Sequence, residues 1–205
     1  MKGNVEKQME LSTFRESVRT EVLENILPFW IEKTTDTYYG GFIGEVSAHG
    51  VPEPQAPKGG ILLSRMLWTF SHAYSLYHNP QYLQAARHAY QFLVQKLWDP
   101  QNGGIYWLVD YQGNPLDTKK HVYAQSFALY GLAEFARVTH DQEALEKAIE
   151  LFLLVDKKAH DPDHLGYMEG FTQEWELLTD NSLADGEQNA AKSMNAHLHW
   201  MEALT

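Results

Sequence analysis

Two segments of the sequence carry polar side chains of the kinds that bind hydroxyl groups or move protons. Asn195 and His199 are four residues apart in KSMNAHLHWMEALT, so they share one face of the helix expected there. Arg65 is a single charge within the apolar stretch GILLSRMLWTFSHAY. Its guanidinium stays protonated, so it must lie in solvent, pair with a carboxylate or point into a polar cavity. Histidine suits acid–base chemistry near neutral pH, but a lone helical histidine also serves as a structural hydrogen bonder.

The histidines of this segment are not expected to bind a metal. His197 and His199 are two residues apart, and side chains at that spacing do not converge on a helix. Glu202, three residues after His199, is the nearby carboxylate. The sequence has no cysteine, so it offers no thiolate ligand and no disulfide framework. We therefore predict no metal site.

Aromatic and acidic residues raise carbohydrate chemistry as a hypothesis. Aromatic rings stack on the apolar faces of sugars, although they are also common in protein cores. A glycosidase needs two carboxyl groups that flank the bond it cleaves, and the sequence places no two candidates at such a separation. The tryptophans concerned are Trp68, Trp107, Trp175 and Trp200, and the candidate carboxylates are Glu45, Glu169, Glu174 and Glu176.

The segment KKHVYAQSFALYGLAEF begins a further helix. Tyr123 fits the core there, with its hydroxyl group bonded to the backbone, and the three residues before it (119–121, two lysines and a histidine) are expected to be solvated. Gly40-Gly41 and Gly103-Gly104 do not continue into a phosphate-binding loop. These features alone assign no activity.

The elements that must position these residues repeat along the chain. A glycine-rich turn followed by alternating apolar residues occurs at Gly40, at Gly103 and, more weakly, at Gly166, with a period of 63 residues. Each unit reads as a short β-hairpin, a helix, a turn and a second helix. The period predicts an all-α toroid of stacked helical hairpins with short β-hairpins in the linking loops. Helices are expected at residues 5–33, 58–78, 80–98, 119–139, 141–160 and from 192, and hairpins at 38–54, 102–115 and 164–175.

Two details of these helices can be compared with the structure. Thr13 and Glu16 fit a capping box at the start of the first helix, with Phe14 on an apolar stripe behind it. In the helix at residues 141–160, Leu145 and Ile149 are predicted to point inward.

Composition limits the classes of partner. The 205 residues are 44% hydrophobic and 13% aromatic, which is typical of a globular protein. The net charge of −11, without a run of Lys or Arg, argues against binding to nucleic acid or to an anionic membrane surface. No apolar run approaches the roughly 18 residues of a spanning helix, and the N-terminus lacks a secretory signal. We therefore expect a cytoplasmic protein.

An acidic, Asn-rich loop is expected at residues 180–190, and the helix that follows it stops at Thr205 without a cap or a partner helix. We expect residues 1–205 to be a single incomplete domain, roughly half of a closed ring. The alternative is a natural short protein with a frayed C-terminal helix.

Four motifs in the order GGFIGEV, PQAPKGGILLSRMLWTFSHAY, KKHVYAQSFALYGLAEF and KSMNAHLHWMEALT resemble the N-terminal half of the cellobiose 2-epimerases. These enzymes belong to the N-acylglucosamine 2-epimerase superfamily. The resemblance covers nearly the whole chain and implies an (α/α)6 barrel. It implies epimerisation at C2 of the reducing-end glucose of β-1,4-linked disaccharides, so that cellobiose gives glucosyl-mannose and lactose gives epilactose; mannobiose is a further candidate substrate. It implies no metal or other cofactor.

The resemblance also assigns residues. The family's cavity-lining Arg, Tyr, Asn and His fall on Arg65, Tyr123, Asn195 and His199. Arg65 and His199 would act on the reacting end of the sugar, while Tyr123 and Asn195 would bind its hydroxyl groups. The family's two acid–base histidines, a glutamate and two sugar-stacking tryptophans belong to the half that this chain lacks. The chain alone is therefore expected to be inactive and to pair with the missing C-terminal half or with itself.

Other functions remain open. An aldose–ketose isomerase acting on mannose or glucose, or an N-acylglucosamine 2-epimerase, would share the enediolate chemistry. An (α/α)6 glycosidase would release a monosaccharide instead. A fragment that binds sugar without catalysis is the alternative from a different class.

Overall fold

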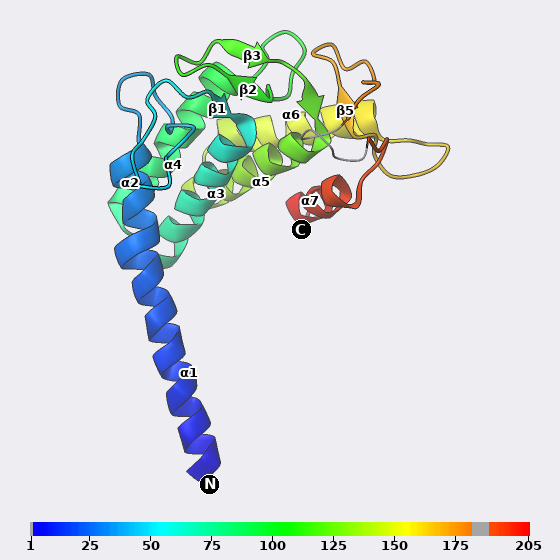
Figure 1. Ribbon diagram of the computed structural model, residues 1–205. Helices are drawn as coiled ribbons and strands as arrows, with labels where there is room; N and C mark the ends of the chain where they lie inside the picture. The colour runs from blue at the N-terminus through cyan, green and yellow to red at the C-terminus, as the bar shows by residue number, and fades with distance from the viewer. Residues whose placement is uncertain (1, 182–188) are drawn as a thin grey trace.

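The computed structural model describes residues 2–181 and 189–205. A continuous opening helix is formed by α1 (Lys2–Thr20), the π-helical turn η1 (Glu21–Ile26) and α2 (Leu27–Thr34). Figure 1 shows α1 extending away from the remaining helices. The helix predicted at residues 5–33 is confirmed, but the capping box is wrong, because the helix begins at Lys2 and runs straight through Thr13. Of the predicted acidic loop, residues 182–188 lie outside the described residues.

Two helical hairpins and a single helix follow. The first hairpin consists of α3 (Gly60–Tyr77) and α4 (Pro80–Phe92), which continues as η2 (Leu93–Leu97); the second consists of α5 (Val122–Thr139) and α6 (Gln142–Ala159). The turns that join the two helices of each hairpin have the same structure. His78 and His140 adopt left-handed conformations with φ of 52° and 58°, and the next residue, Asn79 or Asp141, caps the following helix through its side chain. The last helix is α7 (Met194–Ala203).

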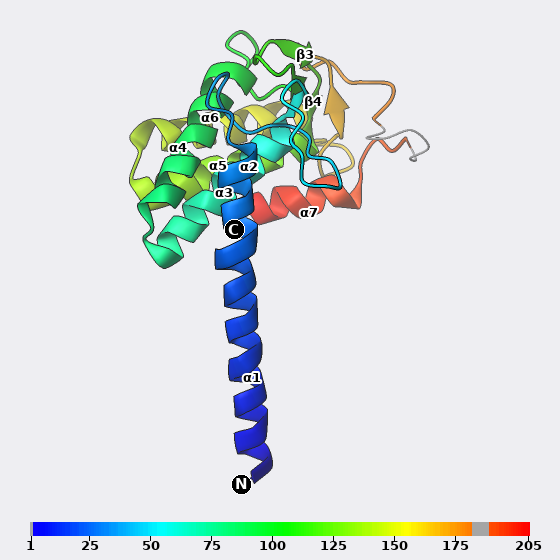
Figure 2. The ribbon, with the colours of Figure 1, turned by 60° about the vertical axis from the view of Figure 1, so that its left-hand side comes forward.

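The helices form two layers. Helices α3, α5 and α7 pack side by side as an inner layer, while α4 packs on α3 and α6 packs on α5 from the outer side (Figure 2). Gly131 lets α3 and α5 approach closely, since a Cβ atom there would lie 2.7 Å from the backbone oxygen of Ser64. The core between the layers is apolar and includes Leu63, Leu67, Phe70, Leu93, Leu132, Phe135, Leu151 and Val155. The predicted helical hairpins are confirmed.

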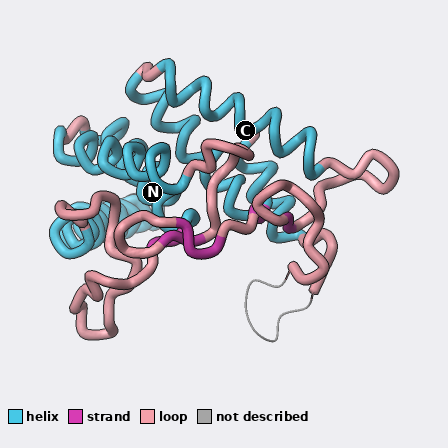
Figure 3. Tube along the Cα trace, turned by 90° about the horizontal axis from the view of Figure 1, so that it is seen from above, coloured by secondary structure: helices cyan, strands magenta, loops and turns pink. Residues whose placement is uncertain are grey.

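The hairpin predicted at residues 102–115 is present, with its second strand ending at Asp117, but other strands pair between repeats. β1 (Lys58–Gly59) pairs with β2 (Leu108–Val109), which also pairs with β3 (Pro115–Asp117). β4 (Lys120–His121) pairs with β5 (Gly170–Phe171). Each strand that precedes an inner helix thus pairs with the loop of the next repeat, and all of these strands lie at the end where α3 and α5 begin (Figures 1 and 3). In the segment predicted as a hairpin at 38–54, the described pairings are single bridges: Val46 pairs with Pro52 around the turn at His49-Gly50, and Phe42 pairs with Thr35, which lies outside the segment.

An aspartate–lysine pair repeats three times at this end. Each aspartate lies two residues after the end of a helix and accepts hydrogen bonds from backbone amides two and three residues later. Each lysine stands two residues before an inner helix and bonds the same aspartate. The pairs are Asp36–Lys58 at 2.6 Å, Asp99–Lys120 at 3.0 Å and Asp161–Lys192 at 2.6 Å. The pairs therefore fasten the end of one helix to the start of the next.

Both edges of the layered structure expose apolar side chains. Leu11, Phe14, Val18 and Ile26 lie along the opening helix, and Phe14 is 64% exposed. On α6, Leu145 and Ile149 were predicted to point inward but are 42% and 50% exposed, together with Leu153, whereas Ala148, Leu151 and Val155 face the core. Within the described residues no helix is long and apolar enough to cross a membrane.

Candidate active site

Phe127 joins three of the four predicted site residues on the inner face. Its ring lies 4.6 Å from that of His199 on α7 and 5.2 Å from that of Tyr123 on α5. The guanidinium carbon of Arg65 on α3 lies 5.4 Å from the centre of the same ring. Tyr123 and His199 also contact each other directly, with ring centres 5.1 Å apart. Three consecutive inner helices therefore bring Arg65, Tyr123 and His199 together.

Arg65 is exposed on this face. Within the described part of the chain no carboxylate lies within 4 Å of its guanidinium, so the Phe127 ring is its ordered contact. Of the three environments that the sequence allows for Arg65, the structure selects an open face lined by aromatic rings. A cation held this way stays available to a ligand with developing negative charge.

His199 and Asn195 lie one turn apart on α7, as their spacing predicts. His199 Nδ1 is 2.7 Å from the carboxylate of Glu202, and Asn195 is exposed. His197 points elsewhere: its Nε2 accepts a hydrogen bond from the backbone amide of Tyr167 at 2.9 Å. The two histidines therefore diverge as predicted, and the described residues contain no cluster of three or more metal-ligating side chains.

The start of α5 corrects one prediction. Lys120 and His121 were expected to be solvated but are fully buried, with exposures of 0% and 1%. Burial lowers the pKa of Lys120 to about 8, against the opposing effect of Asp99. Burial raises the pKa of Asp99, but hydrogen bonds from two backbone amides and Lys120 outweigh it and leave that pKa at about 2. Lys120 and Asp99 therefore form a buried structural ion pair and are not solvated.

The four candidate carboxylates separate into two groups. Glu45, Glu174 and Glu176 are exposed. Glu169 is buried, and its two carboxylate oxygens accept hydrogen bonds from Ser193 Oγ at 2.7 Å and from the Ser193 amide at 2.8 Å. A carboxylate engaged in this way does not fit the free acid–base group of a glycosidase.

The tryptophans also divide. Trp175 and Trp200 are core residues, each at most 6% exposed. Trp68 is partly exposed and lies stacked between His72 and Tyr130, at ring distances of 4.8 and 5.0 Å. Trp107 is partly exposed and carries the Lys119 ammonium group 4.8 Å from its ring centre.

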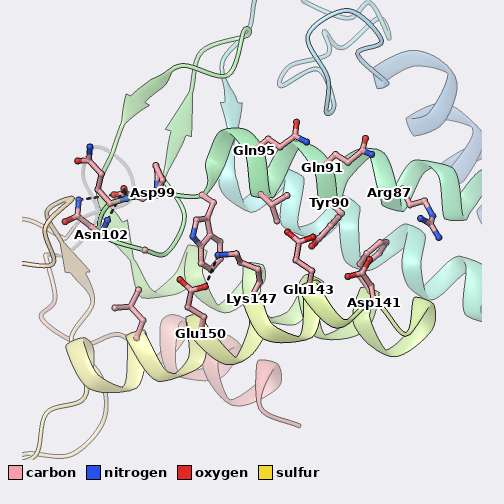
Figure 4. Close-up of a pocket in the computed structure, with 17 residues that line it drawn as sticks. Arg87, Tyr90, Gln91, Gln95, Asp99, Asn102, Asp141, Glu143, Lys147 and Glu150 are labelled. Carbon is pink, nitrogen blue, oxygen red and sulfur yellow. Dashed lines mark hydrogen bonds and ion pairs between the residues drawn. The ribbon is translucent and has the colours of Figure 1, made fainter.

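The outer surface has a groove of about 890 Å³ between α4 and α6. Figure 4 shows its lining, which includes Tyr90, Glu143 and Lys147. None of Arg65, Tyr123, Asn195 and His199 lines it. The groove lies on the outer layer, so we place the candidate active site on the inner face, where the chemically competent side chains meet.

Comparisons with known proteins identify the family to which the chain belongs. The sequence profile described as N-acylglucosamine 2-epimerase (GlcNAc 2-epimerase) matches residues 41–204. The chain belongs to this family. Within it, the cellobiose 2-epimerase of Bacteroides fragilis is 41% identical over 191 residues, which cover 93% of this chain and 49% of that enzyme. The D-mannose isomerase of Marinomonas mediterranea and the bovine N-acylglucosamine 2-epimerase are 25% and 24% identical.

Solved structures of family members extend the match to three dimensions. The cellobiose 2-epimerase of Bacillus thermoamylovorans B4167 superposes with a TM-score of 0.90 at 43% identity, covering 94% of this chain and 49% of that one. The chain thus has the (α/α)6 barrel fold predicted from the resemblance, with about half of the ring present. It spans about half the length of the curated relatives it matches.

Sequence reasoning missed two residues of this region. Phe127 was not singled out, because an aromatic residue in an apolar helix looks like core. Glu169 was considered only as a catalytic carboxylate. The one signal for Phe127 was its place four residues after Tyr123, on the same helix face.

Proposed function

We propose that the protein containing this chain epimerises C2 of the reducing-end glucose in β-1,4-linked disaccharides such as cellobiose and lactose. The main observation behind this proposal is sequence identity. The chain is about 40% identical to cellobiose 2-epimerases but 24–25% identical to relatives with other named activities. The clustering of Arg65, Tyr123 and His199 around Phe127 supports the same proposal from geometry.

The chemistry requires an open-chain sugar. The C2 hydrogen of a pyranose is not acidic, but ring opening exposes a C1 aldehyde and places C2 next to a carbonyl group. A base then removes the C2 proton to give an enediolate, and a proton returned to the opposite face gives the epimer. Negative charge develops on O1 and O2 during this step, and a fixed cation stabilises it.

Each residue of the candidate site has a role in this scheme. Arg65 would hold O1 and O2 through its planar guanidinium. His199, oriented by its hydrogen bond to Glu202, would bond the same end of the sugar and assist ring opening. Tyr123 and Asn195 would hold hydroxyl groups and fix the open-chain geometry.

The proton-transfer pair is proposed to come from the part of the relatives' length that this chain does not match. Residues 1–205 by themselves are then one incomplete domain with little or no activity. The exposed apolar edges of the opening helix and α6 are consistent with coverage by such a partner segment.

Incubation with cellobiose in D₂O tests the function. The expected product is glucosyl-mannose, with deuterium from solvent at C2 detected by NMR and mass spectrometry. A ketose product would identify an aldose–ketose isomerase, and released glucose would identify a glycosidase. An epimer without deuterium would contradict the enediolate route. N-acetylglucosamine, as a parallel substrate, separates the N-acylglucosamine 2-epimerase alternative.

A further inference from the structure

Glu169 is a buried carboxylate that the proposed reaction does not use. We propose that Glu169 is a positioning residue that fixes the start of α7 against the start of α5 and thereby sets His199 opposite Tyr123. The expected loss of activity rests on the proposed function, whereas the expected displacement of α7 does not.

The contact with α7 is made through Ser193, the residue that caps this helix. Ser193 donates its backbone N–H to one carboxylate oxygen of Glu169 at 2.8 Å and its hydroxyl to the other at 2.7 Å. The same hydroxyl oxygen accepts the Ala196 amide at 3.0 Å. A negative charge at this position also interacts favourably with the N-terminus of a helix. Glu169 therefore bonds the capping residue of α7 through both of its carboxylate oxygens.

The contact with α5 is made mainly through the backbone. The carbonyl oxygen of Glu169 accepts the amide of Val122, the first residue of α5, at 2.9 Å. Its carboxylate also lies 3.8 Å from Nε2 of the buried His121. The next residue, Gly170, pairs with His121 in the β4–β5 ladder. Glu169 thus bonds the starts of both helices.

These bonds lie close to the candidate site along each helix. Tyr123 directly follows Val122, and Asn195 is two residues after Ser193, with His199 one turn further on. A shift of α7 at its start would move His199 away from Tyr123 and Phe127, whose rings it now contacts. Misplacement by about 1 Å can cost on the order of 100-fold in rate.

A double-mutant cycle in the complete enzyme separates positioning from general stability. Glu169→Gln keeps the side chain's size but turns one of its two acceptor atoms into a donor, so it cannot accept both bonds from Ser193. We expect kcat/KM to fall about tenfold or more in the native background, but less than about twofold in a His199→Ala background, because the group being positioned is gone. Ser193→Ala gives a milder version of the same test if Glu169→Gln does not fold. Glu143 is an exposed carboxylate on α6, so Glu143→Gln is the matched control and should leave kcat/KM unchanged in both backgrounds.

The outcome that overturns the proposal is an equal loss in both backgrounds, which would indicate a role in stability alone. A crystal structure of the Glu169→Gln protein provides a readout without activity: we expect α7 to be displaced at Ser193 and the contact between His199 and Tyr123 to be lost. An unchanged contact would also overturn the proposal. If the native protein shows no epimerase activity, the proposed function fails, while the crystal structure still decides the role of Glu169.

Discussion

The guanidinium of Arg65 is held by an aromatic ring, and this predicts how it tolerates substitution. Lysine at this position would keep the charge but lose the planar fork and the contact with the Phe127 face. We expect Arg65→Lys to lower the kcat/KM of the complete enzyme by about 100-fold, in the range measured for loss of one oxyanion donor. Arg87→Lys, on the exposed side of α4, is the control and should leave steady-state kinetics unchanged. Near-native kinetics of Arg65→Lys would remove Arg65 from the proposed mechanism.

At the residue scale, sequence patterns singled out the polar members of the candidate site but not the aromatic residue that supports them. Arg65, Asn195 and His199 stand out because a charge or an amide in an apolar helix requires a reason. Phe127 has no such contrast with its neighbours, although it contacts Arg65, Tyr123 and His199. Lys120 was misjudged because a lysine next to a loop is usually solvated, and its partner Asp99 is too distant in sequence for local patterns to show.

The repeated aspartate–lysine pairs make a prediction about single helical repeats. Both side chains of Asp99–Lys120 are 0% exposed, whereas the Asp161–Lys192 pair is partly exposed. Asp99→Asn would leave a buried cation without its counter-charge and should lower the free energy of unfolding by about 3–5 kcal/mol. Asp161→Asn, the equivalent change at the exposed pair, should cost clearly less. Urea unfolding followed by circular dichroism measures both, and equal losses would contradict the role of burial.

Acid should weaken the same fastenings. The pKa of Asp99 is about 2 in the folded protein against an ordinary value of 3.8, so the unfolded chain binds more protons between these values. The pair's stabilisation is therefore fully present above about pH 4 and is lost as the pH falls toward 2. Urea midpoints measured from pH 5 to pH 2 should fall in this window. The Asp99→Asn variant should show a shallower decline, and a parallel decline would argue against this carboxylate.

At the element scale, the helices and the β2–β3 hairpin were predictable, whereas strand partners in other repeats were not. Apolar periodicity places α3 to α6 within a few residues of their observed bounds. The strands β1 and β4 are two residues long and carry no periodic signal, and their partners lie in the following repeat, as in Lys58 with Val109. The exposure of Leu145 and Ile149 was missed because α6 lies at an edge of the structure, where the described residues do not cover its apolar stripe.

The apolar edges of the whole molecule predict self-association of the 205-residue chain. Leu145, Ile149 and Leu153 form one exposed stripe along α6, and Phe14 and Val18 lie on another along the opening helix. We expect sedimentation velocity to show concentration-dependent oligomers. Replacing the three α6 residues by glutamine should reduce association, whereas Leu116→Gln, an exposed apolar residue on β3, should not. A monomer at all concentrations would contradict this expectation.

The pairing of each pre-helical strand with the next repeat also bears on how the chain folds during its synthesis. The amide of Gly60 at the start of α3 bonds the carbonyl oxygen of Trp107, just as Val122 at the start of α5 bonds that of Glu169. An inner helix therefore lacks its terminal partner until a further repeat has left the ribosome. We expect protease resistance of α3 in stalled nascent chains to appear only once residues 107–109 have emerged. Protection in shorter chains would contradict this. If the expectation holds, synthesis runs one repeat ahead of folding.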